Sequence, residues 1–288
     1  TYLSTQKILM DPSKRNVWFI TGCSKGFGFC LVKALLASDQ QKFRVAATTR
    51  STETLINEIK GLNLDLNRLL PLNVDLMDED SIKDAFNKTI EKFGKIDVLV
   101  NNAGFGLTGC LEEAKTEDFQ KLFDINVFAV HKVIRNVLPI MRKQNYGLIL
   151  NMSSIGAQCP RGGNGIYAAT KAAVVAMTES LADEASDFNI KACAICPGPY
   201  RTNFQAALQV VQPQVDAYKR IHDQVNQFMS MRFPGDPEDG AKTIIKVAFL
   251  ENIPTVFFLG EMSCTNAKKK FTALSNQVTE FEKLSLEG

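Results

Sequence analysis

Residues 17–28 read Val-Trp-Phe-Ile-Thr-Gly-Cys-Ser-Lys-Gly-Phe-Gly, an apolar run that changes abruptly into a polar segment with glycines. The apolar run predicts a short buried strand, and the glycines after it predict a loop. Beyond the loop, the spacing of Leu31, Leu35 and Leu36 predicts a helix. Strand, glycine loop and helix form the first half of a dinucleotide-binding unit, because glycines and a helix N-terminus let backbone N–H groups approach a pyrophosphate.

The glycine spacing of this loop is G-x-x-x-G-x-G rather than the commoner G-x-G-x-x-G. Such a motif also fits a plain tight turn, so it carries limited weight alone. The candidate dinucleotide contacts in the loop are Gly22, Ser24, Lys25, Gly26, Phe27 and Gly28.

The second predicted strand, Arg44 to Thr49, bears on which dinucleotide is bound. In such folds an acidic residue about 20 positions after the glycines holds the ribose of NAD, whereas a nearby arginine accommodates the extra phosphate of NADP. Here the neutral Thr49 holds that position and Arg50 follows it. Lys25 adds a second cation, and two cations attract a 2′-phosphate. The sequence therefore predicts NADP(H), although Arg50 also fits a solvated loop.

Tyr167 and Lys171 are four residues apart in a predicted helix, so their side chains share one helical face. A free phenol titrates near pKa ~10. An ammonium group about 4 Å away interacts strongly enough to lower that value toward neutrality. We therefore expect an acid-base phenol whose pKa is lowered by lysine, although the same spacing occurs on ordinary solvated helix faces.

Ser154 strengthens the catalytic interpretation through its place in the predicted sheet. Leu148 to Met152 predicts a buried strand, and Gly156 to Gly165 predicts a loop before the helix of Tyr167. Ser154 therefore lies at the carboxyl end of a strand, where open α/β sheets bind ligands. The candidate site combines a hydroxyl, a phenol and a cation.

Two further strands end in residues suited to ligand contact. Leu69 to Val74 is followed by Asp75, which either contacts an adenine amine or starts a turn. Val98 to Val100 runs into a segment of small and short polar residues that lets a backbone approach a ligand, although a plain turn favours the same residue types. The candidate contacts in that segment are Asn102, Ala103 and Gly104.

Asn126 lies within the apolar pattern of a long predicted helix, from about Phe119 to Met141. A buried amide needs hydrogen-bond partners. We expect it either to join two backbone segments or to hold a water next to Lys171.

The sixth predicted strand, Lys191 to Cys196, ends abruptly at Pro197 and Gly198. The insertion that follows, rich in apolar residues, predicts a substrate lobe or lid at about residues 199–233. Its apolar side chains either favour a greasy substrate or serve the packing of the lobe itself.

A last strand is predicted at Val256 to Leu259, and an amphipathic helix at about Thr265 to Leu284. The sequence contains no internal repeat, low-complexity segment or linker. One domain over residues 1–288 is therefore the expected organisation.

The composition argues against several classes of function. The 33 basic and 31 acidic residues give a net charge of +2, which provides no reason to expect nucleic acid or an acidic membrane as partner. The expected partner is a small molecule. His131 and His222 are the only histidines, so we expect no histidine-based metal site and place both on ordinary helices.

The expected location is the cytoplasm. The sequence has no apolar run near the ~20 residues of a membrane span, and Thr1 to Asn16 lacks the apolar segment of a signal peptide. The odd count of 7 cysteines favours reduced thiols. Cys193 and Cys196 have the spacing of a redox pair, but on a strand they point to opposite faces.

Taken in order, these motifs resemble the short-chain dehydrogenase/reductase family, over residues 15 to 260 or so. The resemblance implies a Rossmann-type, doubly wound α/β fold, with a seven-stranded parallel sheet, helices on both faces and a small helical substrate lobe. The motifs are Thr21 to Gly28, Asp75, Asn101 to Gly104, Asn126, Ser154, Tyr167 with Lys171, and Pro197-Gly198 with Thr202.

The resemblance also implies a role for each matching residue. Tyr167 is the acid-base group, Ser154 positions the carbonyl or hydroxyl, and Lys171 holds the nicotinamide ribose and lowers the phenol pKa. Asn126 anchors a proton-relay water, and Thr202 lies near the nicotinamide amide. Further implied cofactor contacts are Pro197 and Gly198, and the positions used by NADP-preferring members are Lys25 and Arg50.

The expected activity is NADP(H)-dependent interconversion of a carbonyl and an alcohol by hydride transfer. The loop start at Gly22 and the segment from Phe233 to Pro237 look most like the branch of 17β-hydroxysteroid and retinol dehydrogenases. An apolar steroid-, retinoid- or lipid-like substrate is expected, or a small ketone or aldehyde. The pocket candidates are Phe105, Gly106, Leu107, Ile155, Tyr200 and the lobe.

Two other interpretations stay open. One is a non-catalytic NADP(H)-binding sensor or scaffold, against which the complete set of Asn126, Ser154, Tyr167 and Lys171 argues. The other is a sugar-nucleotide epimerase on the same fold, which Thr49 and Arg50 disfavour. Members of the family are usually homodimers or homotetramers, so we expect one of these assemblies.

Overall fold

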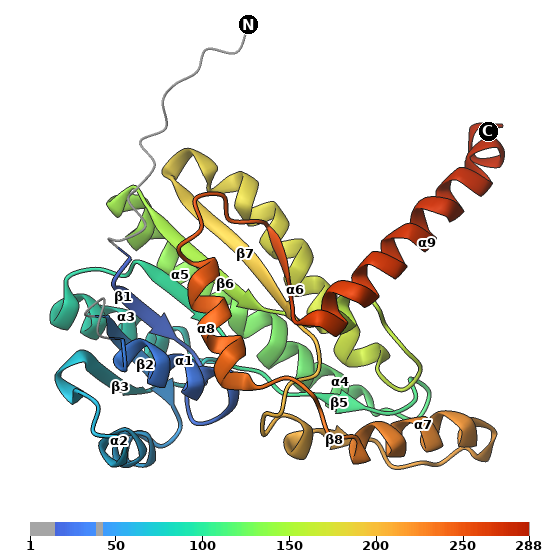
Figure 1. The fold of residues 1–288 in the computed structure, drawn as a ribbon, viewed down its shortest axis with the longest axis horizontal. Coiled ribbons are helices and arrows are strands. Elements are labelled where there is room, and N and C mark those ends of the chain that lie inside the picture. The colour runs from blue at the N-terminus through green and yellow to red at the C-terminus, as the bar shows by residue number, and fades with distance from the viewer. Residues whose placement is uncertain (1–14, 39–42, 288) are drawn as a thin grey trace, which may run out of the picture.

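A 7-stranded parallel sheet forms the centre of the protein, as the computed structural model shows for residues 15–38 and 43–287 (Figure 1). The strand order is β3-β2-β1-β4-β6-β7-β9. The strands are β1 (Val17–Ile20), β2 (Arg44–Thr49), β3 (Leu69–Asn73), β4 (Val98–Asn101), β6 (Gly147–Met152), β7 (Ile190–Pro197) and β9 (Val256–Leu259). The predicted sheet is confirmed. The predicted domain also includes residues 1–14, 39–42 and 288, which lie outside the described ranges.

Helices cover both faces of the sheet (Figure 1). Side chains of α1, α2 and α8 pack on one face, and side chains of α3, α5 and α6 pack on the other. The helices in the described ranges are α1 (Gly26–Leu36), α2 (Thr52–Gly61), α3 (Glu79–Phe93), α4 (Thr116–Phe123), α5 (Ala129–Gln144), α6 (Gly165–Glu184), α7 (Lys219–Ser230), α8 (Pro237–Val247) and α9 (Glu261–Leu286). Short 3-10 turns cover Leu66–Arg68, Ile155–Ala157, Ser186–Phe188, Gln205–Ala207 and Asp216–Tyr218.

Neighbouring side chains on a buried strand enter different cores. Trp18 and Ile20 pack with α1 and α8, whereas Phe19 packs on the opposite face, with its ring 4.6 Å from that of Phe86. A strand covered on both faces is apolar throughout, which is why β1 reads as a continuous apolar run. The same alternation places Cys193 and Cys196 in different apolar clusters and confirms that they point apart.

The long helix expected from Phe119 to Met141 is interrupted. α4 ends at Phe123, a π-helical turn spans Asp124–Phe128, and α5 begins at Ala129. The N–H of Ala129 donates to the carbonyl of Asp124, five residues earlier, instead of four. A π turn adds one residue to a helical turn and is frequent at functional sites, but local residue preferences do not reveal it.

Residues 199–233 form a lobe with α7 as its longest element. Its strand β8 (Gln209–Val210) pairs in parallel with β5 (Leu107–Thr108), a 2-stranded sheet that the sequence did not predict. Two residues are too few to show a strand period. The pairing anchors the lobe over the segment that follows β4.

The C-terminal helix is longer than predicted, because α9 runs from Glu261 to Leu286 instead of from about Thr265 to Leu284. It projects away from the body of the molecule (Figure 1). Among the described residues, no helix is both long enough and apolar enough to cross a membrane.

Candidate active site

The strand order changes direction between β1 and β4, which is where open α/β sheets bind dinucleotides. The loops after these two strands are joined tightly. Oγ1 of Thr21 accepts hydrogen bonds from the N–H groups of Asn102 and Ala103, at 2.9 and 3.0 Å. The side-chain amide of Asn102 donates to the carbonyls of Thr21 and Gly22, at 2.8 and 2.9 Å. The Asn102 side chain therefore holds the glycine loop in place.

Two glycines of the loop have no room for a side chain. A Cβ on Gly22, whose φ is +72°, would lie 2.8 Å from Cα of Ala103. A Cβ on Gly28 would lie 2.4 Å from the carbonyl oxygen of Gly22 and 2.6 Å from Nδ2 of Asn102. The close approach that the motif predicts is therefore present, and it brings the start of α1 next to the end of β4.

The N-terminus of α1 opens into a cavity of 280 Å³. Lys25 is the N-cap residue, and its side chain makes no capping hydrogen bond. The first N–H groups of a helix lack intrahelical partners and favour anions. The cavity therefore fits a phosphate group of a dinucleotide. Its lining includes Ser24, Lys25, Gly26, Arg201, Thr202 and Asn203.

The two predicted phosphate-binding cations lie in different surroundings. Lys25 lines this cavity, whereas Arg50 is exposed at the end of β2. Neither side chain has an ion-pair partner within the described ranges. The cavity also contains Glu58 and Arg201, and Arg201 is paired with Asp236 at 3.0 Å. Lys25 is therefore the cation of this lining that has no ion-pair partner in the described ranges, the acid Glu58 lines the same cavity, and Arg50 lies outside the lining.

Asp75 follows β3, and its Oδ1 accepts a hydrogen bond from the N–H of Met77 at 2.8 Å. The N–H of Asp75 donates to Oγ of Ser81 at 3.1 Å. Asp75 therefore starts a turn, which is one of its two predicted roles. Contact with adenine stays a prediction.

Ser154 and Tyr167 meet at the carboxyl end of β6. Ser154 precedes the 3-10 turn that follows β6, and its Oγ accepts a hydrogen bond from the N–H of Gly156 at 3.0 Å. Tyr167 lies in the first turn of α6 and hydrogen-bonds to the Ser154 side chain. The ring of Phe204, from the lobe, lies 5.5 Å from the ring of Tyr167. The phenol is therefore held between a serine hydroxyl and an apolar lobe residue.

Lys171 is buried behind the phenol. Its Nζ lies 5.8 Å from the centroid of the Tyr167 ring and donates to the carbonyl of Met152 at 2.8 Å. Oγ of Ser153 donates to the carbonyl of Lys171 at 2.8 Å. Burial lowers the pKa of Lys171 from 10.5 to about 8, which places its charge change close to neutrality.

The pKa of Tyr167 moves opposite to the expected direction. Burial raises it above its ordinary value, and the hydrogen bond with Ser154 opposes the rise only in part. Burying the phenolate away from water costs more free energy here than its interactions with neighbouring groups recover. The phenol therefore keeps its proton at neutral pH, and the expectation of a phenol pKa lowered toward neutrality is wrong for this arrangement, because burial outweighs the neighbouring groups.

Asn126 lies in the π turn and is fully buried, at 0% exposure. Its Nδ2 donates to the carbonyl of Phe105 at 2.9 Å and to Oγ1 of Thr170 at 3.2 Å. Its Oδ1 accepts from the N–H of Phe105 at 3.1 Å. The amide thus joins the segment after β4 to α6. A Cβ on Gly104 would lie 2.8 Å from this Oδ1 and 3.6 Å from Nζ of Lys171. The role of holding a water stays a prediction.

The predicted contacts after β7 lie on the other side of the glycine loop. A Cβ on Gly26 would lie 3.6 Å from Cβ of Thr202, so Thr202 closes the cavity opposite α1. The N–H of Gly198 donates to the carbonyl of Leu259 at 3.0 Å. Pro197, the residue before it, is the last residue of β7. Tyr200, a pocket candidate, packs instead against Phe27, with ring centroids 5.0 Å apart.

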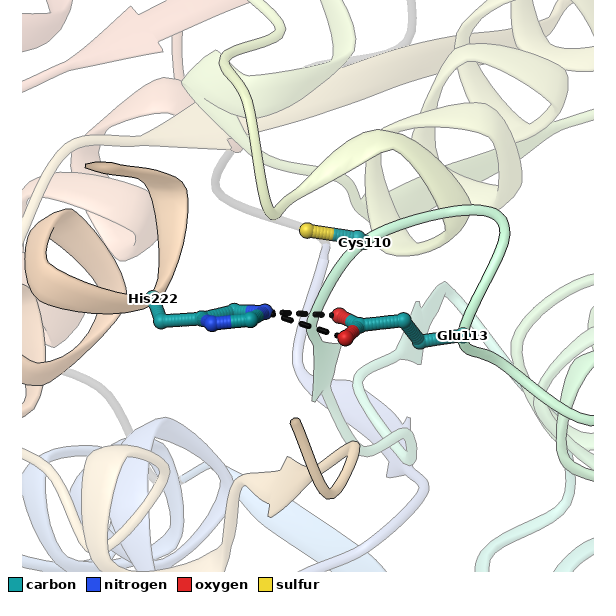
Figure 2. A group of neighbouring side chains, drawn as sticks. All are labelled: Cys110, Glu113 and His222. Carbon is teal, nitrogen blue, oxygen red and sulfur yellow. Dashed lines mark hydrogen bonds and ion pairs between the residues drawn. The ribbon is translucent and has the colours of Figure 1, made fainter. Parts of the chain in front are cut away.

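A buried carboxylate that the sequence did not single out fastens the lobe (Figure 2). Glu113 accepts hydrogen bonds from the N–H groups of Gln214 and Val215, at 2.7 and 2.9 Å. Its Oε2 lies 2.9 Å from Nε2 of His222 on α7. We call Glu113, His222 and these two N–H groups the lobe latch. The backbone donors, of which Gln214 has the largest effect, lower the pKa of Glu113 to about 2.

Cys110 completes this group, because donor atoms of Cys110, Glu113 and His222 lie within 4.8 Å of one another. Burial raises the pKa of the Cys110 thiol to about 11, so it is a neutral thiol at physiological pH. The Glu113 carboxylate contacts both the Cys110 thiol and His222, which supports a structural role for His222 in the latch.

Comparisons with known proteins agree with the geometry. A family model described as short chain dehydrogenase matches residues 16–212. The chain is 30% identical to Oxidoreductase BOA17 of Botryotinia fuckeliana, over 94% of this chain and 98% of that protein. It is 32% identical to retinol dehydrogenase 8 of Bos taurus, over 83% of this chain and 79% of that protein.

Two solved structures share the fold. A short-chain dehydrogenase from Streptomyces avermitilis superimposes with a TM-score of 0.86 at 30% identity, covering 95% of this chain and 99% of that one. The structure of ElxO with NADP bound has a TM-score of 0.69 at 30% identity, covering 83% of this chain and 93% of that one.

Proposed function

The chain belongs to the short-chain dehydrogenase family, and from this membership we propose that it is an NADP(H)-dependent oxidoreductase that interconverts a carbonyl and an alcohol. The observation that carries the proposal is the hydrogen bond between Ser154 and Tyr167, with Lys171 buried behind the phenol, at the carboxyl end of β6. A family member that only bound the nucleotide would have no use for this combination.

The chain offers a complete set of groups for the dinucleotide. The uncapped N-terminus of α1 and the glycine loop take the phosphates, and Gly104 and Lys171 lie where the nicotinamide end is expected. Further proposed contacts are Asp75, Asn102, Ala103, Pro197, Gly198 and Thr202. When bound, the nicotinamide supplies or accepts the hydride.

Tyr167 handles the proton. During reduction its hydroxyl proton goes to the substrate oxygen, so that C=O becomes CH–OH, and during oxidation the phenolate takes the proton of the alcohol. Ser154 donates a hydrogen bond to the same oxygen and holds it next to the phenol. The ammonium of Lys171 stabilises the phenolate that forms, because the raised pKa of Tyr167 makes that charge costly without a cation.

The preference for NADP(H) rests on charge. Lys25 lines the phosphate cavity without an ion-pair partner in the described part of the chain, and β2 ends at Thr49 and is followed by Arg50, with no acid at either position. A 2′-phosphate is attracted to unpaired cations.

The substrate is proposed to be apolar. The ring of Phe204 faces the ring of Tyr167, and a Cβ on Gly106 would lie 2.2 Å from Cδ2 of Leu208, so apolar lobe residues close over the acid-base group. The similarity to retinol dehydrogenase 8 supports the same class. We propose a steroid-, retinoid- or lipid-like ketone or alcohol, or a small ketone or aldehyde.

The test is the oxidation of NADPH by the purified protein with panels of steroid, retinoid, quinone and aldehyde carbonyl compounds. Turnover is expected with at least one apolar carbonyl, and Tyr167→Phe should abolish it while NADPH binding, measured by fluorescence, is retained. Turnover that is unchanged in Tyr167→Phe would contradict the proposal. Binding of NADPH with no turnover of any panel member would favour the sensor or scaffold, and NAD retained through purification would favour the epimerase.

A further inference from the structure

The outer part of α9 touches the body only at its start, where the ring of Phe271 lies 5.8 Å from that of Phe258 on β9, and no described residue beyond it is buried. At its base, Ser263 is fully buried and its Oγ donates to the carbonyl of Cys196 at 2.7 Å, and Ala267 is 3% exposed. From Phe271 onward every described residue is exposed. This segment is the arm that leaves the body in Figure 1.

The arm carries large apolar side chains on one face. Phe271, Leu274, Val278 and Phe281 are 44%, 41%, 69% and 53% exposed. Their spacing of three, four and three residues is that of a coiled-coil seam, and they fall within an arc of about 80° on the helix. Such a seam in water is unfavourable unless another surface covers it.

Charges along α9 are segregated. Near the body, Lys268, Lys269 and Lys270 outnumber the single acid Glu261, and near the tip Glu280 and Glu282 outnumber the single base Lys283. The helix macrodipole does not explain acids near a C-terminus, because it favours cations there. Nor does an anionic membrane surface, which attracts basic residues and repels acids.

Two of these charges border the seam on the same side. Successive residues are rotated by about 100° around the helix axis. Glu282 directly follows Phe281 of the seam, and Lys268, two heptads earlier, lies on the same side of the seam. Lys269 lies on the opposite face of the helix. Lys268 and Glu282 take part in no ion pair among the residues described.

We propose that α9 pairs with α9 of a second copy of this chain in an antiparallel arrangement. Phe271 of one copy then packs on Phe281 of the other, and Leu274 packs on Val278. In an antiparallel pair, the same side of the seam in one helix faces that side in the other helix. Lys268 of each copy therefore meets Glu282 of the other, once at each end of the seam. A parallel pair would set Lys270 beside Ser275 and Gln277 beside Glu282, with no pair of opposite charges.

The base of α9 offers a place for the tip of the second copy. A cavity of 480 Å³ lies there, lined by residues of β9 and its neighbours together with Phe271. The apolar part of the lining is Pro254, Val256, Phe258 and Phe271. Leu284 and Leu286, which are 69% and 78% exposed at the tip, arrive next to it in the antiparallel arrangement. A parallel arrangement would leave these leucines in water.

Charge reversal tests the pairing in the full chain. Sedimentation equilibrium over a range of concentrations should show a dimer that Lys268→Glu or Glu282→Lys weakens by about tenfold or more, since each replaces two attractive contacts with repulsive ones. The double variant should restore the dimer to within about threefold, because the pairs are only exchanged. Lys269→Glu, on the far face, is the matched control and should leave association unchanged.

Orientation is tested separately by cross-linking. In a Cys264→Ser background, Ser275→Cys should form a disulfide-linked dimer under mild oxidation, because Ser275 lies near the two-fold axis of an antiparallel pair. A monomer at all concentrations, or a dimer equally tight in both single charge variants, would overturn the proposal. So would binding of the arm to vesicles of phosphatidylcholine and phosphatidylserine that Phe281→Lys abolishes without any change in the association state. NADPH turnover by these variants should be unchanged, because none of the residues lies near Tyr167.

Discussion

The carboxylate of Glu113 lies 2.9 Å from Nε2 of His222, and this contact fastens the lobe to the loop after β5. The two residues are 109 positions apart in the sequence. Glu113 also accepts the N–H groups of Gln214 and Val215, so a single buried side chain holds three points of the lobe. Because the lobe carries Phe204 against Tyr167, the latch sets the shape of the proposed substrate site.

The first prediction concerns substrate binding. Glu113→Gln keeps the size of the side chain but loses the charge that three donors share, so the lobe should dock less firmly. We expect the KM for the carbonyl substrate to rise several-fold, with a smaller change in kcat and in the KM for NADPH, in steady-state assays. Glu117→Gln, on an exposed position of α4, is the control. An equal rise in KM in both variants would show that the effect does not come from the lobe latch.

The second prediction concerns acid. The pKa of Glu113 falls from 4.5 to about 2 in the folded lobe, so its contribution to docking is fully present above pH 4.5 and is lost as the pH falls toward 2. Pepsin, which acts in this range, should cut within residues 204–233 increasingly between these values. In Glu113→Gln the cleavage should already be present near pH 4.5 and change little below it. Mass spectrometry of the fragments locates the cuts.

The third prediction concerns alkali. Burial lowers the pKa of Lys171 to about 8, so the ammonium is present below that pH and is lost above it. If the ammonium stabilises the Tyr167 phenolate, the rate of carbonyl reduction should fall as the pH rises through about 8. Lys171→Arg, which keeps its proton, should move the fall to higher pH, and Lys171→Met should lower kcat by about 10²-fold or more at every pH. A fall in rate at the same pH in all three proteins would show that another group is responsible.

The fourth prediction concerns the cofactor. Removing one charge-assisted contact to a phosphate costs about 1.5–3 kcal/mol, or roughly tenfold or more in affinity. Lys25→Ala and Arg50→Ala should therefore each raise the KM for NADPH by that factor and leave the KM for NADH almost unchanged. Arg44→Ala, at the opposite end of β2, is the matched control. Equal effects on NADPH and NADH would indicate that the two cations do not contact a 2′-phosphate.

Local patterns in the sequence were sufficient to predict the strands of the sheet and the central residues of the candidate site. The strand β1 begins and ends where its apolar run does, because a strand covered on both faces must be apolar along its whole length. The glycines at positions 22 and 28 mark the close approach of two loops. The four-residue spacing of Tyr167 and Lys171 follows from helix geometry alone.

Features that depend on contacts between distant segments were visible only in the folded chain. Glu113 and His222 are ordinary residues in their own surroundings, and the pairing of β5 with β8 joins two-residue strands that are far apart in the sequence. The pKa of Tyr167 rises because burial depends on everything packed around the phenol, whereas sequence spacing reports only its neighbour on the helix. Periodicity records which side of a segment is apolar, but desolvation and long-range hydrogen bonds exist only after the segments have been brought together.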